Sequence, residues 1–432
     1  MRSHLLILAL FCSTCTYCKG NDSARPCPQP AACPKAASAD DAKTALPPAP
    51  SPPPTIVVKE PVCAWTASPP DAGAHAHRLS HAVVAFPWQL EASLGLKARV
   101  TTTPVKLGGD RWVVADHRGR IHALTVVQEK GRWSIRPAWK SKPSADSIWS
   151  APVVSADGGV LWVGSDDDHV YRLNAADGAV LGKVAPFACT PKKATDPESA
   201  RCDQDMAALQ LSDGGVLTGG GGVSRLDATG KLVWQHPVTT HVRGSVAQDA
   251  DGHLYVATLG GEILSLTGEG KLRWQARARS QCDSTPVLAP GCTLIVGCDD
   301  RTLNAFSTID GRVKWRLYAP DGFRGGGALS SDGTTLYWGN LDRNLYAVSV
   351  ESGKVQWRYR TAGRQLIPPV VDGAGRVLIF PEEKMLYQLD ASGALVGTFT
   401  LPAIADAHPA WIDERTLLLP LETGEVLLFS GK

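Results

Sequence analysis

Along most of the chain, short apolar runs alternate with clusters of turn-forming residues. Between Cys282 and Trp315 each apolar run is only about five residues long and is followed by Gly, Asp or Pro. The runs are Thr285–Ala289, Thr293–Gly297, Leu303–Phe306 and a last one that contains Val313 and Trp315. No useful length of this segment has the i, i+3, i+4 spacing of an amphipathic helix. The pattern therefore predicts four short antiparallel strands joined by tight turns.

This four-strand unit repeats, and its end is marked by the motif Gly-x-x-x-Trp. The motif ends at Trp234, Trp274, Trp315 and Trp357, so successive tryptophans are 40, 41 and 42 residues apart. A period in this range indicates a ring or a stack of similar supersecondary units. Four antiparallel strands in each unit are typical of a β-propeller blade. The predicted fold class is therefore all-β, and the predicted architecture is a β-propeller.

One position in the last strand of each unit gives the number of blades. The residues at this position are Trp139, Gly182, Trp234, Trp274, Trp315, Trp357 and Gly397. An eighth unit follows, in which His408–Phe429 supplies only three strands. We expect the upstream segment Val83–Glu91 to add the fourth strand, with Trp88 at the repeated position, because ring closure removes exposed sheet edges. The prediction is eight blades, and seven is the alternative if Val100–Trp139 is not a complete blade.

The first 78 residues have a different composition. Residues 1–18 contain a short apolar core after a weakly basic start, which predicts a secretory signal. Cys12, Cys15 and Cys18 are candidates for the lipidated cysteine of a bacterial lipoprotein. Residues 19–78 are rich in Pro and Ala and are predicted to form a disordered tether before a propeller at residues 79–432. We therefore expect an exported protein of the periplasm or outer membrane, either without a membrane anchor or attached only through an N-terminal lipid.

The cysteines agree with export. The chain has 11 cysteines, which suits an oxidising compartment. Cys189 and Cys202 bracket a polar insert, and a disulfide between them would staple it. Cys282 and Cys298 are the second predicted disulfide, because they lie nearly opposite each other if the first two strands of their blade form a hairpin.

Charge and acidic residues point to no metal and no nucleic acid. The formal net charge is only +2, so no global field favours nucleic acid or an acidic membrane. No pair of CxxC motifs indicates a zinc site. The acidic run from Asp166 to His169 is interpreted as a β-turn between two strands, because other blades carry acidic residues at the same place. No metal site is predicted.

The repeats resemble the PQQ-like, or quinoprotein-type, β-propeller repeat. The resemblance rests on blade ends that read LDATGKLVW, FSTIDGRVKW and VSVESGKVQW, and it covers roughly Val83–Lys432. In that family the tryptophan of each outer strand packs between neighbouring blades. The resemblance implies the same docking role for Trp88, Trp139, Trp234, Trp274, Trp315 and Trp357.

The family divides by function. Quinoprotein dehydrogenases bind PQQ and Ca²⁺ on the ring axis, and many have a disulfide between adjacent cysteines; this chain has no adjacent cysteine pair. The chain is more similar to the branch of non-enzymatic propeller lipoproteins of the outer-membrane β-barrel assembly machinery. The resemblance therefore implies a scaffold without a cofactor that binds envelope proteins, as a monomer within a complex. A PQQ-dependent dehydrogenase, or another small-ligand site on the axis, is the alternative.

The residues just before each first strand are the candidate binding residues. In a propeller these segments ring one mouth of the central channel. The aligned positions hold Trp149, Arg243, Asp283, Arg324, Gln365 and His408. Such a mixed polar ring suits a peptide loop or a small anion, and a hydrated funnel without a ligand is the alternative.

Overall fold

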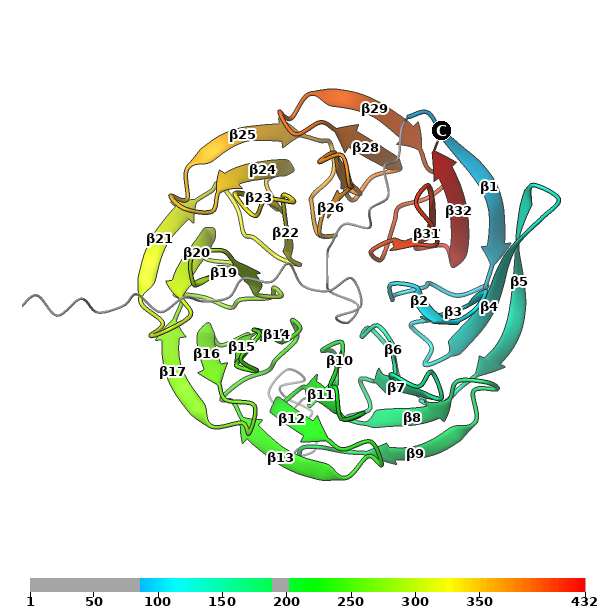
Figure 1. The fold of residues 1–432 in the computed structure, drawn as a ribbon, viewed down its shortest axis with the longest axis horizontal. Coiled ribbons are helices and arrows are strands. Elements are labelled where there is room, and N and C mark those ends of the chain that lie inside the picture. Colours follow the sequence, from blue (N-terminus) through cyan, green and yellow to red (C-terminus); the bar gives the residue numbers. More distant parts are fainter. Residues whose placement is uncertain (1–85, 189–201, 432) are drawn as a thin grey trace, which may run out of the picture. The chain divides into compact units, whose positions relative to one another are not determined.

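The computed structural model describes residues 86–188 and 202–431, which belong to one compact unit of the chain, Glu60–Lys432. These residues form eight four-stranded antiparallel sheets arranged around a central axis (Figure 1). The predicted all-β, eight-bladed propeller is confirmed, and the seven-bladed alternative is wrong. The predicted signal, the tether and the candidates Cys12, Cys15 and Cys18 lie outside the described residues.

Each of the first four blades runs from an inner strand near the axis to an outer strand at the rim (Figure 1). Blade 1 consists of β2 (Val105–Gly108), β3 (Arg111–Ala115), β4 (Ile121–Glu129) and β5 (Arg132–Ser141). Blade 2 consists of β6 (Val153–Val154), β7 (Val160–Gly164), β8 (Val170–Asn174) and β9 (Val180–Val184). Blade 3 consists of β10 (Leu209–Gln210), β11 (Val216–Gly219), β12 (Gly222–Leu226) and β13 (Leu232–Pro237). Blade 4 consists of β14 (Ala247–Gln248), β15 (Leu254–Ala257), β16 (Glu262–Leu266) and β17 (Leu272–Arg277).

The other four blades have the same order of strands, except at the point of closure. Blade 5 consists of β18 (Val287–Ala289), β19 (Thr293–Gly297), β20 (Thr302–Ser307) and β21 (Val313–Tyr318). Blade 6 consists of β22 (Gly327–Leu329), β23 (Thr335–Gly339), β24 (Asn344–Ser349) and β25 (Val355–Arg360). Blade 7 consists of β26 (Val370–Val371), β27 (Val377–Ile379), β28 (Met385–Leu389) and β29 (Leu395–Thr400). Blade 8 consists of β30 (Ala410–Trp411), β31 (Thr416–Pro420), β32 (Glu425–Gly431) and β1 (Trp88–Gly95).

Strand β1 closes the ring as predicted, but in a different register. It pairs antiparallel with β32 and forms the outer strand of blade 8. The outer strands of blades 4 and 8 each contain a β-bulge. The first paired residue after the bulge is Trp274 in blade 4, whereas it is Ala92 in β1. Trp88 lies four residues before Ala92 and therefore not at the repeated position. It is buried instead in the apolar cluster between blades 7 and 8.

The hydrophobic core is divided among the blade interfaces. The described residues contain eight buried apolar clusters, one between each pair of neighbouring blades. Between blades 4 and 5, for example, Ile263 packs with Val296 and Phe306. Because the middle strands are covered by a neighbour on both faces, strands such as β19 and β23 are buried along their whole length, whereas the outer strands β21 and β25 alternate between exposed and half-buried residues.

Both ends of the Gly-x-x-x-Trp motif belong to contacts between blades. The indole Nε1 of five outer-strand tryptophans donates a hydrogen bond of 2.8–3.3 Å to a backbone carbonyl in the next blade. These tryptophans are Trp139, Trp234, Trp274, Trp315 and Trp357. Each ring also lies against the turn glycine of the next blade, where a β-carbon would come within 2.5–2.6 Å of the indole. These glycines are Gly178, Gly270, Gly311, Gly353 and Gly393, and all have positive φ. Glycine is thus required both by the turn and by the neighbouring ring.

The blade that carries Gly182 uses a different residue for the same contact. Arg172 is paired with Gly182 across strands β8 and β9. Its guanidinium donates a hydrogen bond to the carbonyl of Thr229 in blade 3. A β-carbon on the turn residue Gly230 would come within 2.9 Å of the Cδ atom of Arg172. Arg172 therefore replaces the missing tryptophan, with its cationic group 5.2 Å from the ring of Trp162.

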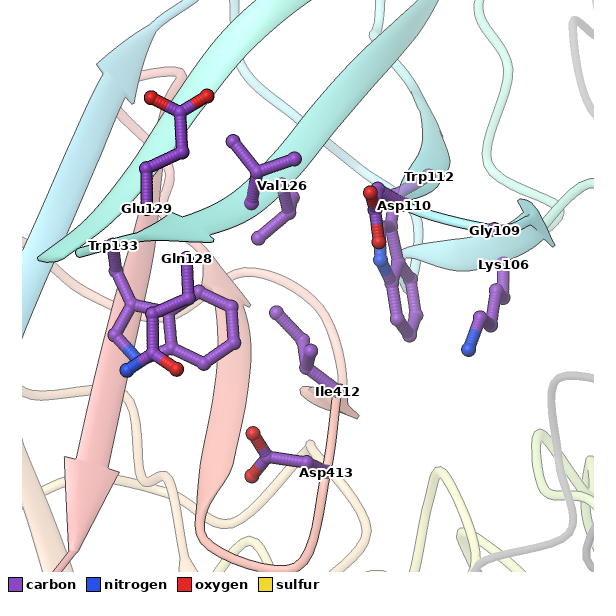
Figure 2. Close-up of a pocket in the computed structure, with 11 residues that line it drawn as sticks. Lys106, Gly109, Asp110, Trp112, Val126, Gln128, Glu129, Trp133, Ile412 and Asp413 are labelled. Atoms are coloured by element: carbon purple, nitrogen blue, oxygen red, sulfur yellow. The ribbon is translucent and has the colours of Figure 1, made fainter. Parts of the chain in front are cut away.

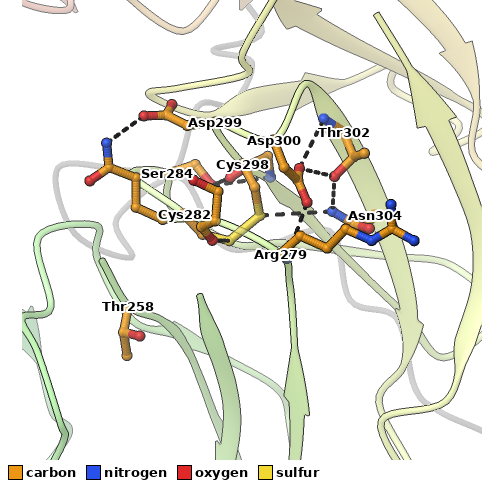
Figure 3. The surroundings of a disulfide bond; sticks show 12 residues. Thr258, Arg279, Cys282, Ser284, Cys298, Asp299, Asp300, Thr302 and Asn304 are labelled. Atoms are coloured by element: carbon orange, nitrogen blue, oxygen red, sulfur yellow. Dashed lines mark hydrogen bonds between the residues drawn. A yellow bond between two sulfur atoms is a disulfide. The ribbon is translucent and has the colours of Figure 1, made fainter. Parts of the chain in front are cut away.

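The structure joins Cys282 and Cys298 by a disulfide with an S–S distance of 2.05 Å and a Cα–Cα distance of 4.0 Å (Figure 3). Both cysteines are buried in the cluster between blades 4 and 5. Cys189 lies outside the described residues, so its pairing with Cys202 stays a prediction.

Across residues 86–188 and 202–431, no helix has the length and apolar character needed to cross a membrane.

Candidate functional site

One end of the ring gathers two kinds of loop. The connection that enters each inner strand and the turn between the second and third strands lie at the same end, because the strands of a blade are antiparallel. We call this end the mouth. Trp149, Arg243, Asp283, Arg324, Gln365 and His408 all lie in the connections that precede an inner strand. Four of them pair through their side chains with residues on other loops, whereas the side chains of Gln365 and His408 contact their own connections.

Arg243 links three consecutive blades at the mouth. Its Nε lies 3.3 Å from Oδ2 of Asp205, on the loop that enters blade 3. Its Nη1 lies 3.3 Å from Oδ2 of Asp283, on the loop that enters blade 5. Two of the predicted mouth residues, Arg243 and Asp283, are therefore brought together. The long side chain of Arg243 remains partly exposed, so the mouth presents a cation held between two carboxylates.

Two further arginines form bidentate ion pairs around the mouth. Nε and Nη2 of Arg324 lie 2.8 Å and 2.6 Å from the two carboxylate oxygens of Asp299. Burial raises the pKa of Asp299, whereas the hydrogen bonds and the positive charge of Arg324 lower it. The net effect is a pKa below the usual value for a carboxyl group. Arg99, which no sequence pattern distinguished, has its Nε and Nη2 each 2.6 Å from a carboxylate oxygen of Asp406. Such fork-shaped pairs orient both partners more firmly than single hydrogen bonds do.

Trp149 is the most exposed aromatic group of the predicted set, with 43% of its surface accessible. Its Nε1 donates a hydrogen bond of 3.1 Å to Oδ2 of Asp166. The guanidinium of Arg99 lies 5.5 Å from the centre of its ring. An exposed indole between a cation and a carboxylate is a suitable surface for a protein partner, since aromatic and arginine side chains are enriched in interfaces.

Gln365 and His408 are less accessible than the other mouth residues. Gln365 is only 1% exposed, and its Nε2 donates to Oγ1 of Thr361 at 2.6 Å, so it supports the loop from within. Nδ1 of His408 lies 2.9 Å from the carbonyl of Pro409. Burial lowers the pKa of His408 to about 4, so this histidine is neutral at physiological pH. The ring of candidates is thus not uniform: its exposed part runs from Trp149 to Arg324.

A group of carboxylates at the mouth was not predicted as a unit. Asp166, Asp203 and Asp205 place one carboxylate oxygen each within 4.8 Å of one another. Burial, together with the nearby carboxylate of Asp205, raises the pKa of Asp166 to about 8. Asp166 does lie in a turn, as the sequence analysis proposed, between β7 and β8. The repeat pattern does not predict that Asp166 lies close to Asp203 and Asp205. Those two residues are in the loop before β10, whereas the pattern places acidic residues in the turns within blades.

A cavity lies at the end of the ring opposite the mouth, where the first and third turns of each blade are found. Strands β4 and β5 are longer than their counterparts and project as a hairpin beside β1 (Figure 1). The cavity, of about 560 Å³, opens between this hairpin and the first turn of blade 8 (Figure 2). Trp112, Trp133 and Ile412 line it together with Asp110 and Asp413. No sequence pattern distinguished these residues.

Comparisons with known proteins agree with this architecture. Residues 219–430 match the family model for PQQ-type repeats described as outer membrane protein assembly factor BamB. The BamB of Bordetella pertussis is 27% identical over 106 residues, which is 24% of this chain and 27% of that protein. The match thus spans about a quarter of the length of the curated relative.

Solved structures match over a larger part of the chain. The crystal structure of BamB from Moraxella catarrhalis covers 80% of this chain and 100% of its own, with a TM-score of 0.62 and 18% identity. The computationally designed Ika8 protein covers 79% of this chain and 99% of its own, with a TM-score of 0.63 and 12% identity. At these identities the structural matches show the fold, and the family-model match adds the type of repeat. The chain is a PQQ-like β-propeller that resembles outer membrane protein assembly factor BamB.

Proposed function

We propose that this chain is a non-enzymatic scaffold that binds protein partners in the bacterial cell envelope and takes part in outer-membrane protein assembly. The observation that carries the proposal is the match of residues 219–430 to the BamB family model. Export to the periplasm or outer membrane, with attachment through an N-terminal lipid, belongs to the same proposal. No bound cofactor is needed for this function.

The mouth is the surface that we assign to partner binding. Trp149 and Arg243 are exposed there, whereas their polar atoms are oriented by Asp166, Asp205 and Asp283. Side chains that are already held in place lose less conformational entropy when a partner binds. A partner loop with an acidic group next to an apolar one would meet complementary groups in Arg99 and Trp149.

The proposal is tested by site-specific photo-crosslinking in native envelopes. A photoreactive amino acid at position 149 is expected to capture an envelope protein of the outer-membrane assembly machinery. The matched control is position 351, where Glu351 is exposed in the turn between β24 and β25 at the opposite end of the ring. Capture of the same proteins from both positions, or of none from position 149, would contradict partner binding at the mouth.

A separate measurement addresses the enzymatic alternative. The purified chain is incubated with PQQ and Ca²⁺ and assayed for a cofactor absorbance band and dye-linked alcohol oxidation. A scaffold is expected to show neither signal. Oxidation that depends on both additions would replace the scaffold function with that of a quinoprotein dehydrogenase.

A further inference from the structure

Loops of three consecutive blades place three carboxyl groups close together at the mouth, with an imidazole beside one of them. Asp166 comes from the turn between β7 and β8, Asp203 and Asp205 from the loop that enters blade 3, and His241 from the loop that enters blade 4. We call these four residues the mouth cluster. One oxygen from each of the three carboxylates lies within 4.8 Å of the others. Two ligands that are each about 2.1 Å from one ion lie at most about 4.2 Å apart, so small side-chain adjustments suffice for shared coordination.

His241 is an independent indication of a ligand. Only 9% of the residue is exposed, and both ring nitrogens are enclosed without a hydrogen-bond partner. Its Nε2 lies 3.6 Å from Oδ2 of Asp205, which is beyond hydrogen-bond distance but within ion-pair distance, so the imidazole faces this carboxylate of the cluster. Buried polar groups are nearly always hydrogen-bonded, so ring nitrogens that lack such a bond beside a carboxylate are candidates for metal coordination. Oδ1 of Asp166 and Oδ1 of Asp205 are likewise enclosed and lack a hydrogen-bond partner.

The backbone holds the cluster in place without using its side chains. The amide of Gln204 donates to the carbonyl of Ser165 at 3.1 Å, which fixes the residues on either side of Gln204 against the turn that carries Asp166. The amide of Leu259 donates to the carbonyl of His241 at 2.9 Å. The neighbouring Arg243 contributes one positive charge, which it shares between Asp205 and Asp283. Carboxyl groups this close together repel one another when they are ionised, and a shared cation would reduce that repulsion.

We propose that the mouth cluster binds one divalent transition-metal ion of the Mn²⁺ or Zn²⁺ type. Carboxylate oxygens alone would favour Mg²⁺ or Ca²⁺, whereas an added imidazole favours Zn²⁺ and related ions. The ion would tie blades 2, 3 and 4 together beside Arg243. This inference does not depend on the proposed partner binding.

The test is metal binding to the purified full chain after treatment with EDTA. Calorimetry with Mn²⁺ and with Zn²⁺ is expected to show one site per chain, and Asp205→Asn and His241→Gln are each expected to weaken it more than about tenfold. The control is Asp251→Asn, because Asp249, Asp251 and His253 form another group of potential ligands in a turn of blade 4. This control is expected to bind like the wild type. The ion should also raise the unfolding midpoint of the wild type but not that of Asp205→Asn, with the circular dichroism of both proteins in EDTA reporting whether the variant is folded.

Each other result has a definite meaning. Loss of binding in Asp251→Asn with retention in Asp205→Asn would overturn the proposal and move the site to the turn. Binding of Ca²⁺ with equal affinity in wild type and His241→Gln would overturn the assignment of the imidazole as a ligand. No heat of binding and no shift in the unfolding midpoint with any of these ions would overturn the site itself.

Discussion

Phe86 lies directly against Gly397, so that a β-carbon on Gly397 would come within 2.5 Å of the phenyl ring. Gly397 is the outer-strand residue of blade 7 where other blades have a docking tryptophan. In blade 8 the third and fourth strands come from opposite ends of the propeller sequence, so no turn glycine joins them. Phe86, which precedes β1, lies there instead. The glycine is thus explained by ring closure.

We expect Gly397→Ala to lower the free energy of unfolding by about 1–3 kcal/mol, because the added methyl group overlaps the ring of Phe86. Phe86→Ala in the same chain should remove most of this effect, which a double-mutant cycle measures. Gly182→Ala is the matched control: it has the same place in blade 2, and its β-carbon would meet no atom within 4 Å. Equal effects at positions 182 and 397 would argue against the contact.

The docking tryptophans should contribute strongly to stability. Trp315 donates a hydrogen bond of 2.8 Å to the carbonyl of Val350, and its ring covers Gly353. Trp315→Ala is expected to cost about 3–5 kcal/mol, as for other large-to-small changes at packed sites. Tyr318→Ala on the same strand is the control, since Tyr318 is 62% exposed, and it should change stability by less than about 0.5 kcal/mol. Denaturant unfolding followed by tryptophan fluorescence compares the two, and a similar loss in both variants would contradict an interblade role for Trp315.

Closure by β1 can be tested by truncation. A chain that begins after Gly95 lacks the strand that pairs with β32 and leaves that edge unpaired. We expect it to unfold at a lower temperature and to aggregate, as measured by light scattering during heating. A chain that begins at Phe86 keeps β1 and serves as the control. Equal melting and solubility of the two truncated chains would show that β1 is dispensable.

The pH dependence of stability should include a contribution from His408. Its pKa falls from 6.5 to about 4 on folding, because burial disfavours the charged imidazole. Between these pH values the unfolded chain binds a proton that the folded chain does not bind. The contribution of His408 to the free energy of unfolding is therefore complete above pH 6.5. It is lost as the pH falls toward 4, which lowers the free energy of unfolding by about 1–3 kcal/mol. Unfolding curves from pH 4 to 7 should show this loss in the wild type but not in His408→Gln, and identical curves would refute it.

The blade was predictable because its determinants are close together in the chain. Runs such as Thr293–Gly297 and the turns after them are read from a few neighbouring residues, and the structure gives β19 the same bounds. The register of β1 was not predictable in the same way. Trp88 resembles the repeated tryptophans in sequence, but pairing with β32 places Ala92 at that position, since a strand from a distant segment can slide along its partner.

The same difference between local and long-range determinants applies to the candidate site. The sequence by itself determined the propeller fold, the order of the strands in a blade and which residues precede the inner strands, because each depends on a short local pattern that is repeated along the chain, whereas the structure decided between seven and eight blades. Only the tertiary structure decided that Arg172 replaces a tryptophan, that Phe86 covers Gly397, and that Asp166 and His241 both lie beside Asp205. These contacts join different blades, and their geometry depends on how the blades pack around the closed ring.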